Sequence, residues 1–146
     1  MAKTNALITK YRVEVDTDNI FGSDIVQVGG LSLGEEGMIE VPEQDKIAQV
    51  SDGVVKYAPL DIKFRLSEGL VTFDYFLALW DERASRNTDI AIIETRRDGV
   101  TELFRWIFTD CEMKKFASAE DLVLGEIKVK QIDTSFAFNE ARILKA

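Results

Sequence analysis

Histidine is absent from this 146-residue sequence, and cysteine occurs once, as Cys111. Catalytic arrangements of the Ser-His-Asp or Cys-His type and histidine-based metal sites therefore cannot be built. One cysteine also allows neither an intrachain disulfide nor a cysteine-rich zinc site. Without a histidine partner, Cys111 is expected to be a small hydrophobic residue in a strand rather than a nucleophile. We therefore expect a protein that is not an enzyme and that has no cofactor and no metal site.

Long apolar runs are also missing. The N-terminal segment carries Lys3 and Lys10 but no apolar stretch long enough for a secretory signal, and no later stretch approaches the length of a membrane-spanning helix. We expect a soluble chain that is made in the cytosol and does not insert stably into a membrane.

Basic residues are in the minority: 18 Lys and Arg stand against 26 Asp and Glu, which gives a net charge of -8. Such a balance argues against a protein that grips nucleic-acid phosphates. Hydrophobic residues make up 46% of the chain, which is enough for one compact domain and excludes disorder of its body. We expect a single domain over residues 1–146, with flexible ends at residues 1–8 and 140–146.

Two segments alternate apolar and polar residues with the period of two that is typical of a β-strand. The first strand is predicted over residues 9–16, where Tyr11 and Val13 share the apolar face. Another is predicted over residues 60–66, where Phe64 lies on the apolar face. The charged, alternating-sign outer face of residues 60–66 is typical of a surface that meets solvent or another subunit.

An extended run at residues 25–33 predicts a further strand and contains Gly29 and Gly30. The missing side chains permit a bulge or a close backbone approach. A phosphate-binding loop is the other interpretation, but no Gly-x-Gly-x-x-Gly or Walker pattern surrounds the pair. The strand bulge is favoured.

The period changes to that of a helix over residues 72–83, where apolar residues that include Phe76 and Trp80 recur at i, i+3, i+4 and i+7. One helix is predicted here, with Thr72 as its N-cap. Farther on, an Asp-Gly pair at residues 98–99 lies between two strand-like runs, which predicts a β-hairpin.

The final strand is predicted over residues 125–139, where the apolar residues change from odd to even positions. This change indicates a bulge or a strand that passes from one buried face to another. The sequence therefore predicts a β-rich domain with one helix. The residues expected in its core are Tyr11, Val13, Phe64, Phe76, Trp80, Trp106 and Phe108.

Acidic residues are concentrated between positions 14 and 52, where Lys46 is the only base. Within this third of the chain, residues 34–56 form a long polar arm. The arm has too little periodicity for a core strand and too many apolar side chains for a solvated loop, so a partner that covers it is the best explanation. The residues expected to make that contact are Met38, Ile39, Val41, Pro42, Ile47 and Val50.

The remaining chemical candidates are weak. Asp16, Asp18 and Asp24 lack the spacing and the closing glutamate of a calcium loop, so they predict at most a weak surface ion site. No pair of acids stands out as the acid and nucleophile of a glycosidase. Trp80 and Trp106 fit apolar faces, which favours core packing over stacking on a sugar or a base.

Four motifs, taken in order, resemble successive landmarks of the contractile-phage tail tube family: YRVEVD at residues 11–16, VGGLSL at 28–33, YAPLDIKFRLSEG at 57–69 and FLALWDERAS at 76–85. The similarity continues through the Asp-Gly hairpin and the closing segment EIKVKQIDTSFAFN at 126–139. It therefore covers most of the chain. Similar tubes occur in tailocins, in extracellular contractile injection systems and in type VI secretion, where they are built from haemolysin-coregulated protein.

The resemblance implies an antiparallel β-barrel or sandwich with one flanking helix, assembled into six-fold rings that stack into the hollow inner tube of a contractile tail. It implies as partners further copies of the chain, a tail sheath protein, a baseplate or tube initiator and a tape measure protein. DNA or effectors would pass through the lumen without tight binding. The implied location is the tail of a virion, after synthesis in the host cytoplasm.

The negative charge agrees with this implication, because an acidic wall repels DNA phosphates and lets DNA slide. We therefore expect an acidic lumen and an arm that makes contacts between stacked rings. Phe64, Trp80, Trp106 and Phe108 are expected to be buried rather than lumenal. The alternative from a different class is a monomeric β-barrel module that binds carbohydrate or peptide.

Overall fold

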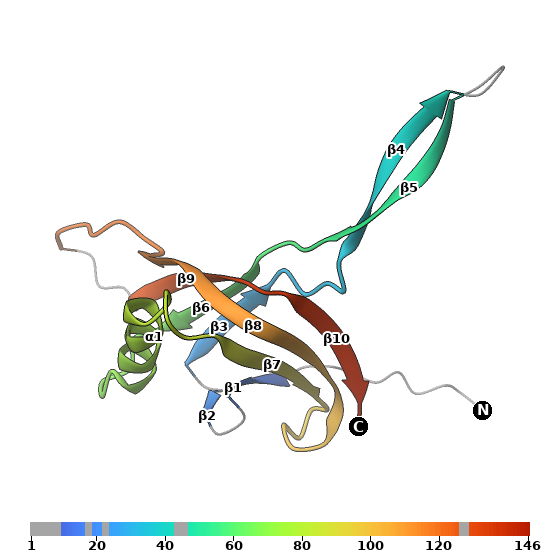
Figure 1. Ribbon diagram of the computed structural model, residues 1–146. Coiled ribbons are helices and arrows are strands. Elements are labelled where there is room, and N and C mark those ends of the chain that lie inside the picture. The colour runs from blue at the N-terminus through green and yellow to red at the C-terminus, as the bar shows by residue number, and fades with distance from the viewer. Residues whose placement is uncertain (1–9, 17–18, 22–23, 43–46, 126–128) are drawn as a thin grey trace.

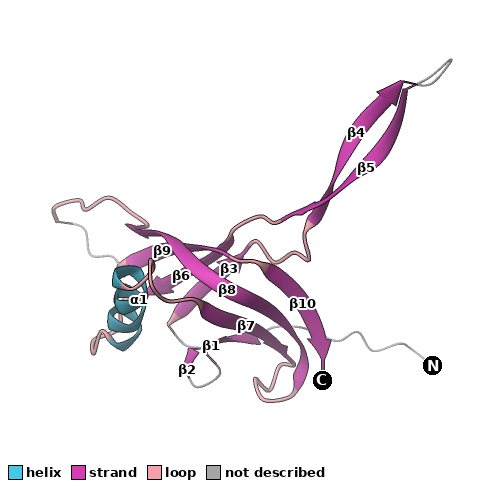
Figure 2. Ribbon diagram, viewed as in Figure 1, coloured by secondary structure: helices cyan, strands magenta, loops and turns pink. Residues whose placement is uncertain are grey.

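The computed structural model describes residues 10–16, 19–21, 24–42, 47–125 and 129–146, and the side chains of these residues except 19–20, 37–42 and 47–54 (Figure 1, Figure 2). No helix among them is long and apolar enough to cross a membrane. The elements are β1 (Lys10–Val15), β2 (Asn19–Phe21), β3 (Ile25–Gly29), β4 (Glu35–Pro42), β5 (Ile47–Lys56), β6 (Leu60–Arg65), α1 (Val71–Asp81), β7 (Thr88–Thr95), β8 (Glu102–Ser118), β9 (Gln131–Ala137) and β10 (Glu140–Lys145).

Antiparallel pairing joins the strands of the body in the order β2-β1-β7-β8-β9-β6-β3, and β10 also pairs with β8. The long strand β8 belongs to two layers. Its first part pairs with β7 and β10, and its last part, from Glu112 to Ser118, pairs with β9. The fold is therefore mainly β and sandwich-like, as expected, while the pairing of the described strands ends at β2 and β3 and does not close into a barrel.

Asp110 lies where β8 passes from one layer to the other, and its backbone is left-handed, with φ 52°. Its backbone N–H donates to Oδ1 of Asp89 at 3.1 Å. Asn139, between β9 and β10, donates from Nδ2 to Oδ2 of Asp110 at 3.2 Å. These side-chain contacts support the bend of β8 and the turn between β9 and β10 next to it.

The core lies between the two layers and under the helix. On β6 the buried Leu60, Ile62 and Phe64 alternate with charged residues, as the period of two predicts. Of the residues expected in the core, Val13, Phe64, Phe76 and Phe108 are fully buried. Tyr11, Trp80 and Trp106 are half-buried and pack against this cluster from its margin.

Helix α1 covers one end of the body (Figure 1). Its Phe76 is fully buried and stacks on Phe64 of β6, with the ring centroids 4.9 Å apart. The expected helix is confirmed, but Thr72 is not its N-cap. The cap is Leu70 in a left-handed conformation, with φ 52°, and the Thr72 hydroxyl instead donates to Oδ2 of Asp24 at 2.9 Å.

The C-terminal part of the chain differs from the prediction. The last long strand begins at Gln131 rather than at residue 125, and residues 126–128 lie outside the described part. Residues 140–145, expected to be a flexible end, form β10 instead, because the free side of β8 supplies backbone partners for them. The other expected flexible end, residues 1–8, lies outside the described residues.

The extended run predicted over residues 25–33 is a shorter strand, β3, which ends at Gly29. The register shift in β3 falls between Ile25 and Gln27, not at the glycine pair. Gly30 has φ 76°, and a Cβ there would lie 2.0 Å from the carbonyl oxygen of Pro59. The glycine pair therefore permits a close backbone approach, as expected: at Gly30 the chain lies against the backbone of Pro59.

Candidate functional site

The arm is a long antiparallel hairpin of β4 and β5, and it projects away from the sandwich (Figure 1). The arm, whose periodicity is too weak to predict a core strand, thus consists of two full strands. An isolated two-stranded hairpin is only marginally stable in water. This geometry therefore favours a surface that a partner covers.

Gly34 lies at the base of the arm, where the chain leaves the body. It has φ 105°, and a Cβ there would lie 2.4 Å from Cγ1 of Val55 and 2.9 Å from Cε1 of Tyr57. The ring of Tyr57 in turn packs on that of Phe138, with centroids 5.0 Å apart. The direction in which the arm leaves the body therefore depends on a glycine at position 34.

The residues expected to contact a partner are distributed along both strands of the arm. The register pairs Ile39 with Val50 and pairs Pro42 with Ile47. Met38 is paired with Ser51, and Val41 with Ala48. Apolar positions are thus paired across much of the hairpin, although the side chains of these residues lie outside the described part.

A groove of about 240 Å³ crosses the outer face of β6 and β9. Two side-chain contacts cross this face: Nζ of Lys63 lies 3.6 Å from Oδ1 of Asp133, and the hydroxyl of Ser135 donates to Asp61. Each of these pairs joins neighbouring strands. The groove therefore has the mixed-charge pattern predicted for residues 60–66, and it is the cross-strand surface of a sheet.

Cys111 is 1% exposed in β8, and burial raises the pKa of its thiol to about 12. The thiol is therefore protonated near neutral pH and packs in the core. Of the three aspartates considered as an ion site, Asp16 pairs with Arg86 and Asp24 accepts from Thr72, whereas Asp18 lies outside the described residues. In the described part of the chain, no group of three or more acidic or cysteine side chains could hold a metal ion.

Ion pairs cover part of the outer face of the layer that contains β1, β7 and the first part of β8. Arg105 of β8 donates from Nε to Oε1 of Glu102 at 2.5 Å and lies 3.9 Å from Oε2 of Glu14 through Nη1. The hydrogen bond from Arg105 holds the pKa of Glu102 below its usual value. The neighbouring Ile93, which the register places between Arg12 and Arg105, is 1% exposed.

The sequence patterns missed one exposed apolar segment. Leu122, Val123 and Leu124 follow the end of β8 and all lie exposed. The sequence predicts a strand just after them, from residue 125. The available signal was a run of three apolar residues behind two acids, with none of the alternation of a strand.

Comparison with known proteins relates the chain to solved structures. No family model matches it, and no curated protein matches it. A chain from the sheath/tube terminator of the PVC extracellular contractile injection system in its extended state aligns with 99% of this chain and 99% of its own length, with a TM-score of 0.76 and 14% identity.

Two further solved structures have the same fold. A chain of the anti-feeding prophage (AFP) baseplate has a TM-score of 0.69 and 14% identity, over 99% of this chain and 98% of its own length. Hcp1 from Flavobacterium johnsoniae has a TM-score of 0.56 and 12% identity, over 94% of this chain and 97% of its own length. The resemblance drawn from the sequence motifs is therefore confirmed at the level of the fold.

Proposed function

We propose that the chain is the structural subunit of the inner tube of a contractile injection apparatus, in which six-fold rings stack into a hollow cylinder. The observation that carries this proposal is the end-to-end match of the fold to a chain of the PVC sheath/tube terminator structure, over 99% of each chain. Because almost no part of either chain is left over, the likeness includes the whole sandwich and helix. A likeness of that extent supports a shared architectural role better than a local match would.

The arm is proposed to make the contacts between stacked rings. It projects from the body, so it can reach beyond the edge of its own ring (Figure 1). The paired apolar positions Ile39 and Val50 would be covered by the neighbouring ring, together with Met38, Val41, Pro42 and Ile47. Burial of apolar area at about 25 cal/mol per Å² would offset the entropy cost of ordering the arm.

The tube is proposed to conduct DNA or effector proteins without binding them tightly. The net charge of -8 supports this role, because a wall with excess carboxylates repels phosphate rather than holding it. The remaining partners would be a sheath protein around the tube, a baseplate or initiator at one end and a tape measure protein inside. Such a tube would be made in the host cytoplasm and would belong to a virion tail or a related particle.

Size-exclusion chromatography with light scattering and negative-stain microscopy test this proposal on the purified chain. A tube subunit gives six-fold rings or filaments, whereas a monomeric carbohydrate- or peptide-binding module stays near 16.5 kDa. A mass near 16.5 kDa at every concentration, with or without a tube initiator, would contradict the proposal.

A shortened chain separates the arm from the body in the same assay. Replacing residues 36–51 by a short Gly-Ser linker is expected to leave the circular dichroism of the sandwich native-like and to stop the rings from stacking. If the shortened protein forms tubes of normal length and stability, the arm is not the stacking element.

A further inference from the structure

An exposed apolar loop, residues 119–125, follows β8 and is anchored at its start. The backbone N–H of Ala119 donates to the carbonyl of Gln131 at 3.0 Å. Beyond that anchor, Leu122 is 86% exposed and Leu124 is fully exposed, and Val123 between them is also exposed. Three adjacent apolar side chains in water are costly, and an exposed cluster of this kind marks an interaction site.

The second surface is strand β10, one side of which has no partner among the described strands. Among the described strands it pairs with β8 only, so one edge of its backbone is open. Ile143 is 40% exposed and Leu144 is 56% exposed, although they point to opposite faces of the sheet. Arg142 and Lys145 flank these two residues and are also exposed. An open edge with exposed apolar side chains is a template for another chain.

The two surfaces complement each other in charge and in polarity. The apolar loop carries the acids Glu120 and Asp121 directly before its apolar run, whereas β10 carries bases on both sides of its apolar pair. Each surface thus offers apolar area and a charge opposite to that of the other. Such complementarity sets the register of a contact and excludes like-charged partners.

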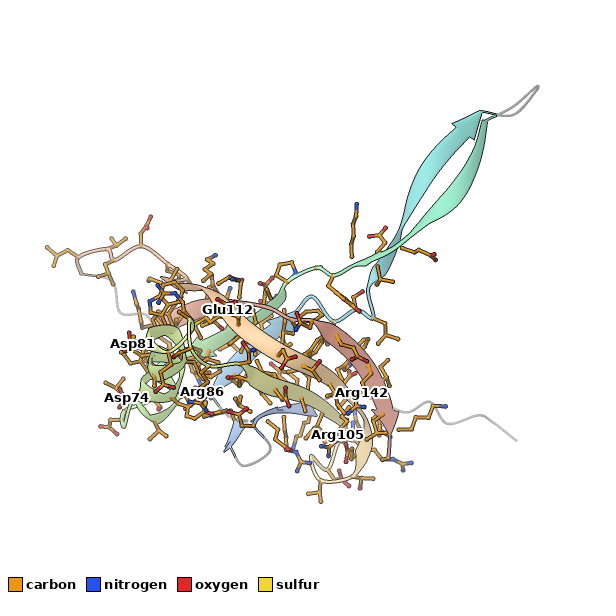
Figure 3. The ribbon with its side chains drawn as sticks, in the orientation of Figure 1. Asp74, Asp81, Arg86, Arg105, Glu112 and Arg142 are labelled. Atoms are coloured by element: carbon orange, nitrogen blue, oxygen red, sulfur yellow. The ribbon has the colours of Figure 1, made fainter. Side chains whose placement is uncertain are left out.

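The same molecule cannot bring the two surfaces together. The apolar loop extends beyond the end of the body that α1 covers, and β10 forms the opposite end (Figure 1). Arg142 and Arg105 lie at the β10 end, while Asp74 and Asp81 lie on α1 at the other (Figure 3). Because opposite ends of one copy complement each other, the contact must join different copies head to tail.

We propose that the apolar loop of one copy docks along the open edge of β10 of the next copy. The contact is heterologous, so repetition of one rotation closes a ring or generates a helix. This inference rests on the proposed function, and it assigns the lateral contact within a ring to two named surfaces. The arm, which is proposed to join rings to one another, takes no part in it.

Cross-linking between variants that each carry one added cysteine tests the contact directly. Leu124→Cys and Leu144→Cys each place a thiol at an exposed position, one on each surface. The only native cysteine, Cys111, is 1% exposed and does not compete. When the two variants are mixed, assembled and mildly oxidised, we expect a disulfide-linked dimer that contains one copy of each.

The matched control is Val100→Cys, which sits in the β7–β8 turn at a position 74% exposed. Mixed with Leu144→Cys, it is expected to give less than about one tenth of the dimer, since the β7–β8 turn belongs to neither surface. Rings that form without the Leu124–Leu144 dimer would overturn this inference and leave the proposed tube function standing. A chain that stays at 16.5 kDa would contradict the tube function, and the inference would fail with it.

Charge reversal gives a second, independent readout. Asp121→Lys or Lys145→Glu alone is expected to raise the protein concentration needed for half-assembly about 5-fold or more at low salt. The double variant, which restores opposite charges between neighbouring copies, is expected to return it to the wild-type value. Glu68→Lys, at an exposed position that belongs to neither surface, serves as the control. A double variant that assembles worse than both single variants would overturn the proposed pairing.

Discussion

Arg86 joins the segment after helix α1 to the end of strand β1: its Nη2 lies 2.7 Å from Oδ2 of Asp16. The same guanidinium donates from Nη1 to Oε2 of Glu82 at 3.0 Å. Asp16 uses its other oxygen to accept the backbone N–H of Asp89 at 3.1 Å. Arg86 therefore links the end of the helix to the end of β1 directly, and to β7 through Asp16.

Replacement of Arg86 by alanine is expected to lower the free energy of unfolding by about 1 kcal/mol, because partly exposed ion pairs contribute little individually. Chemical denaturation of wild-type protein and variant measures the difference. Arg97→Ala, at an exposed position in the β7–β8 turn, is the control and is expected to change stability by less than about 0.5 kcal/mol. Equal effects at positions 86 and 97 would show that the link to Asp16 contributes nothing.

Replacement of Phe76 by alanine is expected to cost about 3–5 kcal/mol of unfolding free energy, since the ring is fully buried and its loss leaves a cavity. The ring stacks on Phe64 and also packs on Phe136, at a centroid distance of 6.2 Å. Val100→Ala, at an exposed position that belongs to neither proposed contact surface, is the control and should be nearly neutral. A loss below about 1.5 kcal/mol at Phe76 would mean that the helix is not anchored through this side chain.

The carboxylate of Asp98 holds the β7–β8 turn. It accepts backbone N–H bonds from Val100 at 2.9 Å and from Thr101 at 2.8 Å, as well as the hydroxyl of Thr101. The Thr101 hydroxyl is the largest of the interactions that lower the pKa of Asp98 to about 2. A lowered pKa stabilises the fold fully above the unfolded value of about 4, and this stabilisation is lost as the pH falls through about 2.

NMR titration of the Asp98 carboxyl is therefore expected to give a midpoint near 2 in the wild-type protein. Thr101→Ala should raise that midpoint toward the ordinary value, while Val100→Ala, which keeps its backbone donor, should leave it unchanged. An unchanged midpoint in Thr101→Ala would show that the hydroxyl does not stabilise the carboxylate.

Replacement of Gly34 by alanine is expected to disturb the base of the arm without unfolding the body. The new methyl group would meet Val55 and Tyr57, and the positive φ adds about 1 kcal/mol of strain. We expect native-like circular dichroism together with weaker stacking of rings. Gly69→Ala is the control, because the nearest atom to its Cβ is 3.7 Å away. Normal tubes from Gly34→Ala would show that the direction of the arm does not matter for stacking.

Much of the sandwich could be predicted because several strands bury one face and expose the other. On β6, Ile62 and Phe64 alternate with charged residues, and the Asp-Gly pair at residues 98–99 marks the hairpin. Strand β10 was not predicted because its short sequence does not keep alternating between apolar and polar residues: Ile143 and Leu144 are adjacent, and both are exposed. Its formation depends on the free side of β8, which is a long-range property.

The assembly surfaces were predicted only in part. The composition of the arm indicated that a partner covers it, but two continuous strands were not expected, because Pro42 and the acids around it interrupt the apolar pattern. The complementarity of the apolar loop and β10 depends on where the fold places residues 119–125 and 140–145. That placement at opposite ends of the molecule has no local signal in the sequence.

Electron microscopy of the purified, concentrated chain tests the central claim most directly. Rotational analysis of end-on views is expected to give rings of six copies around an open channel, and side views are expected to give stacked rings. Particles of a single 16.5 kDa copy, or closed dimers without a channel, would contradict the proposal that this chain builds a tube.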